Sequence, residues 1–165
     1  MSIDDGIGKY EYQLVTPYHV IGNLAFLFKR YGFINIDYEF VDYSTSNLQA
    51  QDYDFDNENS NIKHYYRATH TIRIGGELNL TPVAFRLGYS YTSNPYSKDL
   101  DKDGTMHLIS AGIGYKSRYF FMDFAYQYRF HKDNGRFFDV AGMNNYNTKN
   151  SNQLFALTFG WKLGK

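Results

Sequence analysis

The residues best suited to metal chemistry stand in one short acidic stretch. Asp99, Asp101 and Asp103 alternate with other residues and are followed by Gly104. Carboxylates spaced in this way converge on a hard cation in the first half of a calcium loop, and the glycine permits the sharp turn. The glutamate that closes an EF-hand loop is absent, because Ser110 stands at that position. The stretch is therefore a weak calcium-loop candidate, with a solvated acidic turn as the alternative.

Other groups capable of chemistry are scattered along the chain. Haem can be held by His or Tyr, but no pair of the five histidines has a ligand-like context; these are His19, His64, His70, His107 and His131. Serine, histidine and aspartate all occur, yet none lies in the strand–turn–helix elbow of a hydrolase. Glycine-rich phosphate loops are absent, and so is cysteine. We therefore predict no enzyme and no cofactor, with calcium and haem as minor alternatives.

The secondary-structure elements that position these residues can be predicted from the alternation of apolar and polar side chains, which has a period of two residues. In the segment 153–163 Phe155, Leu157, Phe159 and Trp161 fall on one face, and Ala156, Thr158 and Lys162 on the other. Period two indicates β-strands, since successive side chains point to opposite faces of a sheet. The same rhythm predicts strands over 19–28, 33–43, 63–80, 83–92, 105–116, 119–130 and 153–163, and a weak one over 10–15. No segment has helical spacing, and Gly75-Gly76 is a bulge candidate.

The connections between these strands alternate in length. Tight turns follow residues 28, 80 and 116, whereas polar loops cover 44–62, 93–104 and 131–152. Antiparallel strands joined in this way carry all their tight turns at one end, as membrane barrels do. The predicted fold is therefore all-β: an antiparallel up-and-down transmembrane β-barrel of about eight strands. It forms a single domain over 1–165, or the C-terminal part of a larger barrel.

Composition limits the partners and the compartment. Lys plus Arg and Asp plus Glu both number 17, so charge gives no reason to expect nucleic acid. No apolar stretch is long enough for a membrane-spanning helix. The first residues are acidic and lack the features of a signal peptide. We therefore expect either a mature chain or an excerpt.

Alternation alone leaves two orientations open, with the apolar face either outside against lipid or inside as a core. The apolar faces carry many Phe and Tyr side chains, which number 14 and 17 in the chain and would overfill a small barrel. We therefore predict that the apolar face meets lipid. The polar face would then line the interior, where small residues make room for paired charges, with the charges being Asp37, Glu39, Arg73, Glu77, Arg86, Asp123 and Arg129.

Aromatic pairs recur at matched distances from the tight turns. Six to ten residues beyond each turn, two aromatic side chains share the apolar face, which is where a lipid-facing girdle would lie. The girdle predicted from these pairs and from the last strand comprises Tyr38, Phe40, Tyr89, Tyr91, Tyr126, Tyr128 and Trp161.

Two segments carry a family resemblance. Residues 16–28 read TPYHVIGNLAFLF, and residues 32–44 read GFINIDYEFVDYS. Together with the terminal Phe-Gly-Trp, they resemble the C-terminal half of FadL/TodX-like outer-membrane transporters, particularly those of Bacteroidetes. Members of that family import hydrophobic molecules such as long-chain fatty acids or aromatic hydrocarbons through a plugged barrel of about fourteen strands. This chain differs in having only about eight strands, no plug segment and a last residue that is not aromatic.

The resemblance implies part of a passive transporter for hydrophobic small molecules in the bacterial outer membrane, and it identifies no ligand-binding residues. The expected partners are the lipid bilayer and a hydrophobic ligand, with self-association if the chain is an excerpt, and no nucleic acid. A stand-alone eight-stranded barrel with a structural or adhesive role is the first alternative. A soluble lipocalin-like carrier, with the faces inverted, is the second.

Overall fold

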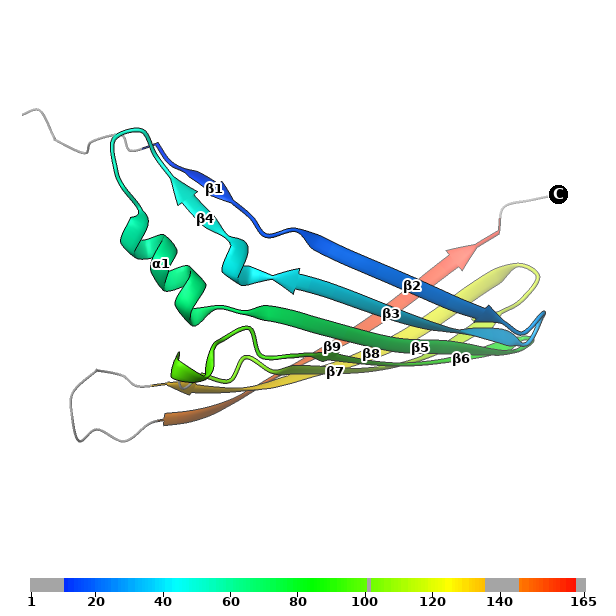
Figure 1. Cartoon of the computed structure of the whole chain (residues 1–165). Coiled ribbons are helices and arrows are strands. Elements are labelled where there is room, and N and C mark those ends of the chain that lie inside the picture. Colours follow the sequence, from blue (N-terminus) through cyan, green and yellow to red (C-terminus); the bar gives the residue numbers. More distant parts are fainter. Residues whose placement is uncertain (1–10, 101, 136–145, 163–165) are drawn as a thin grey trace, which may run out of the picture.

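The computed structural model describes residues 11–100, 102–135 and 146–162. Most of these residues form one sheet of seven antiparallel strands, in which each strand pairs with the next along the chain (Figure 1). The strands of this sheet are β2 (His19–Leu27), β3 (Gly32–Asp42), β5 (Ala68–Leu80), β6 (Val83–Thr92), β7 (Met106–Lys116), β8 (Phe120–Gly135) and β9 (Tyr146–Trp161). The predicted antiparallel, up-and-down all-β fold is thus confirmed.

The sheet has two free edges among the described residues. The outer sides of β2 and β9 have no partner strand, so the seven strands do not close into a ring by themselves. The strands twist strongly, and β9 crosses the direction of β2 in Figure 1. The weak strand expected over 10–15 is β1 (Gln13–Val15), which pairs with β4 (Asn47–Gln49) in a separate small sheet.

The loop predicted over 44–62 is wrong in part. It contains a 3-10 turn (Tyr43–Thr45), β4 and most of the helix α1 (Asp56–Tyr65). The Asp54 carboxylate accepts a hydrogen bond from the backbone N–H of Asp56 at 3.0 Å, near the start of the helix. Acidic residues occupy the first turn and basic residues the last, as the helix dipole favours. A second 3-10 turn (Lys98–Leu100) lies in the loop between β6 and β7.

Two further expectations about the strands are wrong. The register of β5 with both neighbours runs without interruption through Gly75 and Gly76, so no bulge forms there. The loop expected over 131–152 is largely strand, because β8 and β9 pair from Phe120 and Trp161 as far as Gly135 and Tyr146. These residues are polar and show no apolar–polar alternation that would predict a strand. They form one because β8 and β9 hydrogen bond to each other.

The tight turns all lie at one end of the sheet, here called the turn end, and the long connections lie at the other, the loop end. In the first turn Lys29 has φ 51° and Gly32 has φ 140°. A Cβ at position 32 would lie 1.8 Å from the backbone oxygen of Glu77. Only glycine fits this close approach of the turn to β5.

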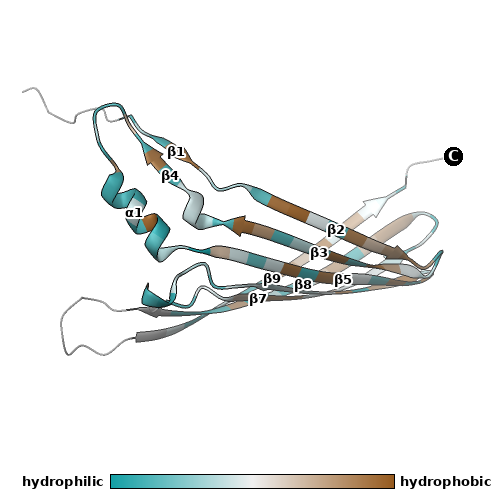
Figure 2. Ribbon diagram, in the orientation of Figure 1, coloured by the Kyte–Doolittle hydropathy of each residue, from teal (hydrophilic) through white to brown (hydrophobic). Residues whose placement is uncertain are grey.

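The sheet has no apolar core. Besides Gly114, the buried described residues are Val41, Thr69 and Thr71. Figure 2 shows apolar and polar residues alternating along the strands, and the apolar side chains are exposed, with Leu87 at 71%. On the polar face the carboxylates are partly covered, with the Glu39 side chain 16% exposed, whereas the Arg73 and Arg86 side chains are 43% and 44% exposed. None of the described helices has the length and apolar character needed to cross a bilayer.

Candidate functional site

One arginine joins three strands on the polar face. Arg86 on β6 contacts Glu77 on β5, with 2.7 Å between Nε and Oε2, and Asp123 on β8, with 2.6 Å between Nη1 and Oδ1. Glu77 lies directly opposite Arg86 in the register, whereas Asp123 lies beyond the intervening strand β7. The guanidinium fork can serve two carboxylates at once, which a lysine could not do with the same geometry.

The contact across β7 depends on Gly114. A Cβ at this position would lie 2.5 Å from the Oδ1 of Asp123 and 3.2 Å from the Nη1 of Arg86. Any side chain there would push the two charged groups apart. Gly114 thus leaves the space in which the two charged groups meet.

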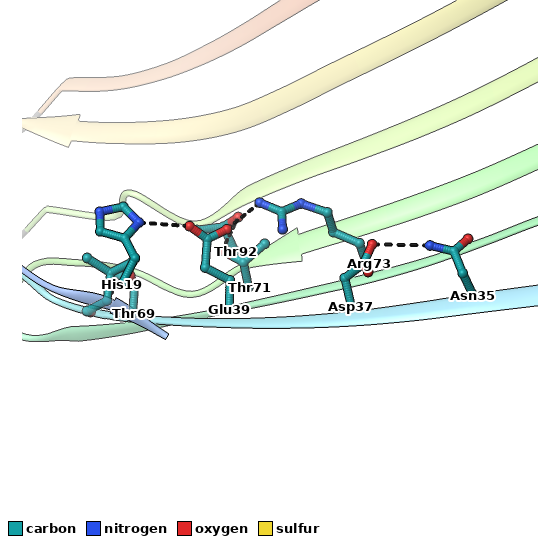
Figure 3. Close-up of polar contacts among 9 residues, drawn as sticks. His19, Asn35, Asp37, Glu39, Thr69, Thr71, Arg73 and Thr92 are labelled. Atoms are coloured by element: carbon teal, nitrogen blue, oxygen red, sulfur yellow. Dashed lines mark hydrogen bonds and ion pairs between the residues drawn. The ribbon is translucent and has the colours of Figure 1, made fainter. Parts of the chain in front are cut away.

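A second polar network lies towards the loop end (Figure 3). Arg73 donates to Glu39 at 2.5 Å, and the Nδ1 of His19 lies 3.1 Å from the same carboxylate. Asp37 accepts hydrogen bonds from Asn23 and Asn35. The hydroxyls of the neighbouring Thr71 and Thr92 are 3.1 Å apart, and Thr69 donates to the backbone oxygen of Val41 at 3.3 Å.

The described contacts thus engage six of the seven predicted interior charges in three groups: Arg86 with Glu77 and Asp123, Arg73 with Glu39, and Asp37 with two asparagines. Arg129, the seventh, lies on the same face but has no acidic partner among the described residues. Sequence reasoning missed His19, Asn23 and Asn35, which complete the network around β3. Their positions in the two-residue alternation carry the signal, because all three fall on the same face as Asp37 and Glu39.

The turn end of the polar face is hollowed. A hollow of about 730 Å³ is lined by residues that include Arg86, Lys116, Arg118, Phe121, Asp123 and Lys162. The ring of Phe121 covers Gly160 on β9, where a Cβ would come within 2.2 Å of it. The hollow therefore combines aromatic and charged groups, a mixture that can hold a small organic molecule.

The apolar face carries an aromatic band near the loop end. Direct pairing places Tyr38, Ile72, Tyr91, His107 and Phe130 in one row across five strands. Of the predicted girdle, Tyr38, Phe40, Tyr89, Tyr91 and Tyr128 lie in this row or beside it. Tyr126 lies closer to the turns, opposite Phe155, and Trp161 lies at the turn end.

Two histidines belong to this band, which the sequence did not indicate. The Tyr38 hydroxyl lies 2.7 Å from the Nδ1 of His70, and the Tyr89 hydroxyl lies 2.8 Å from the Nδ1 of His107. The His107 ring also stacks on Phe130, with 4.9 Å between centroids. Each of these side chains combines an apolar ring with a polar atom, a combination that is favourable at a membrane–water boundary.

Two of the three predicted calcium ligands, Asp99 and Asp103, are engaged in local turns. Asp99 contacts the hydroxyl of Ser97, and Asp103 accepts a hydrogen bond from the backbone N–H of Thr105 at 2.9 Å. The side-chain hydrogen bond from Thr105 is the main cause that holds the pKa of Asp103 below its ordinary value. Asp101 lies outside the described residues. In the part of the chain that the structure describes, no three His, Cys, Asp or Glu side chains are grouped to hold a metal.

The remaining histidines also have ordinary neighbours. The Nε2 of His64 on α1 lies 3.8 Å from an Asp99 carboxylate oxygen, and the Nε2 of His131 lies 3.3 Å from the Asn150 amide nitrogen. Together with the contacts of His19, His70 and His107, these partners spread the five histidines over both faces and the loops.

Comparisons with known proteins show the fold. No family model and no curated protein matches this sequence. Among solved structures, the chain is similar to the monoaromatic hydrocarbon channel CymD, with a TM-score of 0.51 and 14% identity over 91% of this chain. The chain spans 37% of the length of that channel. At this level of identity the similarity shows the antiparallel β-fold alone.

Proposed function

We propose that this sheet is part of the wall of a bacterial outer-membrane β-barrel for the passive passage of hydrophobic small molecules. The observation that carries the proposal is the polarity of the sheet: most charges on the polar face are paired with one another, while large apolar side chains are exposed on the other face. In water such an exposed apolar surface would be costly, whereas lipid accommodates it.

The dimensions of the strands support this placement. β6 has ten residues, and ten residues at ~3.3 Å, tilted by about 40°, climb roughly 25 Å. This height equals the apolar band of membrane barrels, at whose borders aromatic girdles lie. The aromatic band at the loop end and Trp161 at the turn end are separated along the strands in the way that such a placement requires.

The similarity to a hydrocarbon channel supports the transport class, and long-chain fatty acids and monoaromatic compounds are the ligands to test first. The carrier alternative with inverted faces would require the Phe and Tyr side chains to form an enclosed pocket. The hollows that the described residues form are instead lined by polar and charged groups as well as apolar ones.

Site-specific labelling tests the orientation. The chain has no cysteine, so Leu87→Cys and Ser90→Cys each introduce one thiol on opposite faces of β6. In liposomes Leu87→Cys should react with a lipid-soluble maleimide and resist a membrane-impermeant one, and Ser90→Cys should show the reverse preference. Equal reaction of both thiols with the impermeant reagent would overturn the orientation.

Uptake measurements test the transport class. Bacterial cells that lack their own transporter of this kind should take up labelled long-chain fatty acid or toluene faster when they carry the protein in the outer membrane. Uptake of a polar solute such as a disaccharide serves as the control and should not change. Correct insertion without any gain in hydrophobic uptake would contradict the transport function and leave the membrane placement intact.

A further inference from the structure

The charged residues at the turn end all have the same sign. The turns between β2 and β3 and between β7 and β8, with the last residue of β7 and the residue that follows β9, carry five cations, here called the basic rim: Lys29, Arg30, Lys116, Arg118 and Lys162. Three of them, Lys116, Arg118 and Lys162, also border the hollow at the turn end. The segments 28–33, 78–84, 115–122 and 161–162 contain no Asp or Glu. The loop end, by contrast, mixes acidic and basic residues. The rim is therefore a concentrated positive charge at one end of a chain whose total charge is balanced.

The nearest carboxylates do not neutralise the rim. Glu77 and Asp123 are the acidic residues closest to it along the strands, and both pair with Arg86. Within the described ranges none of the five rim residues has an ion-pair partner. Lys162 donates from Nζ to the backbone oxygen of Ser117 at 3.2 Å, which fixes its amine at the rim without cancelling its charge.

The two basic turns share a second feature. Arg30 is followed by Tyr31 and Arg118 by Tyr119, and in each pair the guanidinium carbon lies over the neighbouring ring, at 5.2 Å and 5.8 Å from its centroid. Both tyrosines are more than half exposed. The rings keep the guanidinium groups at the surface, where the planar fork can meet a phosphate with two hydrogen bonds.

The rim also borders the apolar face. Leu80, Phe120 and Trp161 are exposed large side chains on that face at the same end of the sheet, with Trp161 at 74%. If the apolar face meets lipid, as proposed above, this border lies where the acyl chains end and the head groups begin. Long basic side chains extend readily from such a position towards the head groups.

We propose that the basic rim is a binding surface for the phosphate head groups of anionic phospholipids in the leaflet at the turn end. The inference rests on the proposed membrane placement and adds a lipid preference to it. Cations without carboxylate partners, Arg groups held over exposed rings and an adjacent apolar border together match a lipid whose head is anionic and whose tails lie against Phe120 and Trp161. The rim would hold the wall at a defined depth and distinguish its two ends.

The single tryptophan of the chain provides the measurement. Trp161 is the only Trp, so its fluorescence reports on lipid at the rim and nowhere else. The full chain is inserted into vesicles that contain either brominated phosphatidylglycerol or brominated phosphatidylcholine, and the quenching by each lipid is compared. We expect the anionic lipid to bind beside Trp161 at least about fivefold more tightly, as one basic residue near an anionic surface contributes. The preference should fall at high salt because the charges are screened.

Substitutions test whether the preference for the anionic lipid arises from the basic rim. The combined substitution Arg30→Gln, Arg118→Gln and Lys162→Gln should reduce the preference to below about twofold. The matched control is Lys63→Gln, Lys98→Gln and Lys149→Gln, which removes three exposed cations at the loop end. It lowers the net charge equally and should leave the preference unchanged.

Equal quenching of the unmodified chain by the two brominated lipids would overturn the rim proposal while leaving the membrane placement in force. An equal loss of preference in the loop-end control would also overturn it, because the preference would then follow total charge. Absence of quenching by either lipid would overturn the membrane placement itself, and the rim proposal with it.

Discussion

Arg86 serves carboxylates from two other strands, one adjacent and one beyond a glycine. Its side chain is 44% exposed, so water and salt screen part of the attraction. The larger effect of removing it is the one on Glu77 and Asp123, which would remain close together without a cation between them. Arg86 therefore contributes to stability mainly by neutralising the two carboxylates, and less through the strength of either ion pair.

We expect Arg86→Met to lower the free energy of unfolding by about 1–2 kcal/mol, an allowance between the values for exposed and buried pairs. Arg129→Met is the matched control, because Arg129 lies on the same face without a described acidic partner. Its effect should stay within about 0.5 kcal/mol. Urea titration of the protein in detergent micelles, followed by circular dichroism, measures both, and equal losses would show that the Arg86 contacts contribute nothing specific.

At the scale of elements, the strands were predictable where one face is apolar throughout. The segment predicted over 83–92 coincides with β6, whose alternation has no exception. The helix α1 was missed because it is polar on all sides and has no apolar stripe. The loop-end half of β9 was missed for a related reason: its residues are polar on both faces, and pairing with β8 forms the strand.

The contact between Arg86 and Asp123 was beyond sequence reasoning as well. Both residues were predicted to line the interior, but their pairing depends on the register of three strands and on the gap at Gly114. Neither the register nor the gap can be read from alternation, because a shift of two residues preserves every face. The sequence therefore predicts which face a charge occupies more readily than which charge it meets.

The side chain of Asn59 links the helix α1 to the small sheet. The Asn59 amide oxygen accepts a hydrogen bond from the backbone N–H of Leu48 at 2.8 Å, and its amide nitrogen donates to the Leu48 oxygen at 2.9 Å. This double contact acts as an additional strand partner for β4. It explains how a polar helix can hold a fixed place among long connections.

We expect Asn59→Ala to release β4 and α1 from each other while the seven-stranded sheet stays intact. Hydrogen exchange of the Leu48 amide should accelerate by about five- to tenfold, as the loss of roughly 1 kcal/mol per hydrogen bond implies. Asn61→Ala, on an exposed position of the same helix, should leave that exchange rate unchanged. Unchanged exchange in Asn59→Ala would show that other contacts hold the helix.

For the whole molecule, the two free edges determine what the chain needs from its surroundings. Backbone N–H and C=O groups on the outer sides of β2 and β9 have no partner strand in the described part of the chain. Unsatisfied backbone groups are not tolerated in hydrocarbon. The wall is therefore complete only when further strands, from this protein or from another copy, pair with both edges.

We expect the chain alone, purified in mild detergent, to associate through these edges into dimers or larger assemblies, as light scattering after size exclusion would show. The double variant Leu24→Cys and Leu157→Cys, with one thiol on each edge strand, should form disulfides between chains on oxidation. Leu87→Cys and Phe124→Cys, on inner strands, are the control and should not. A monodisperse monomer without cross-links would contradict association through the edges.

The order of the strands has a consequence for how such walls change in evolution. Every strand of the seven-stranded sheet pairs only with the strands before and after it in that sheet, and each tight turn joins two strands into a hairpin that carries its own apolar face. Duplication or loss of one hairpin would therefore change the circumference without breaking any hydrogen bond elsewhere in the sheet. In a closed barrel built from such hairpins, the circumference would therefore change two strands at a time, and each hairpin would keep its own side chains.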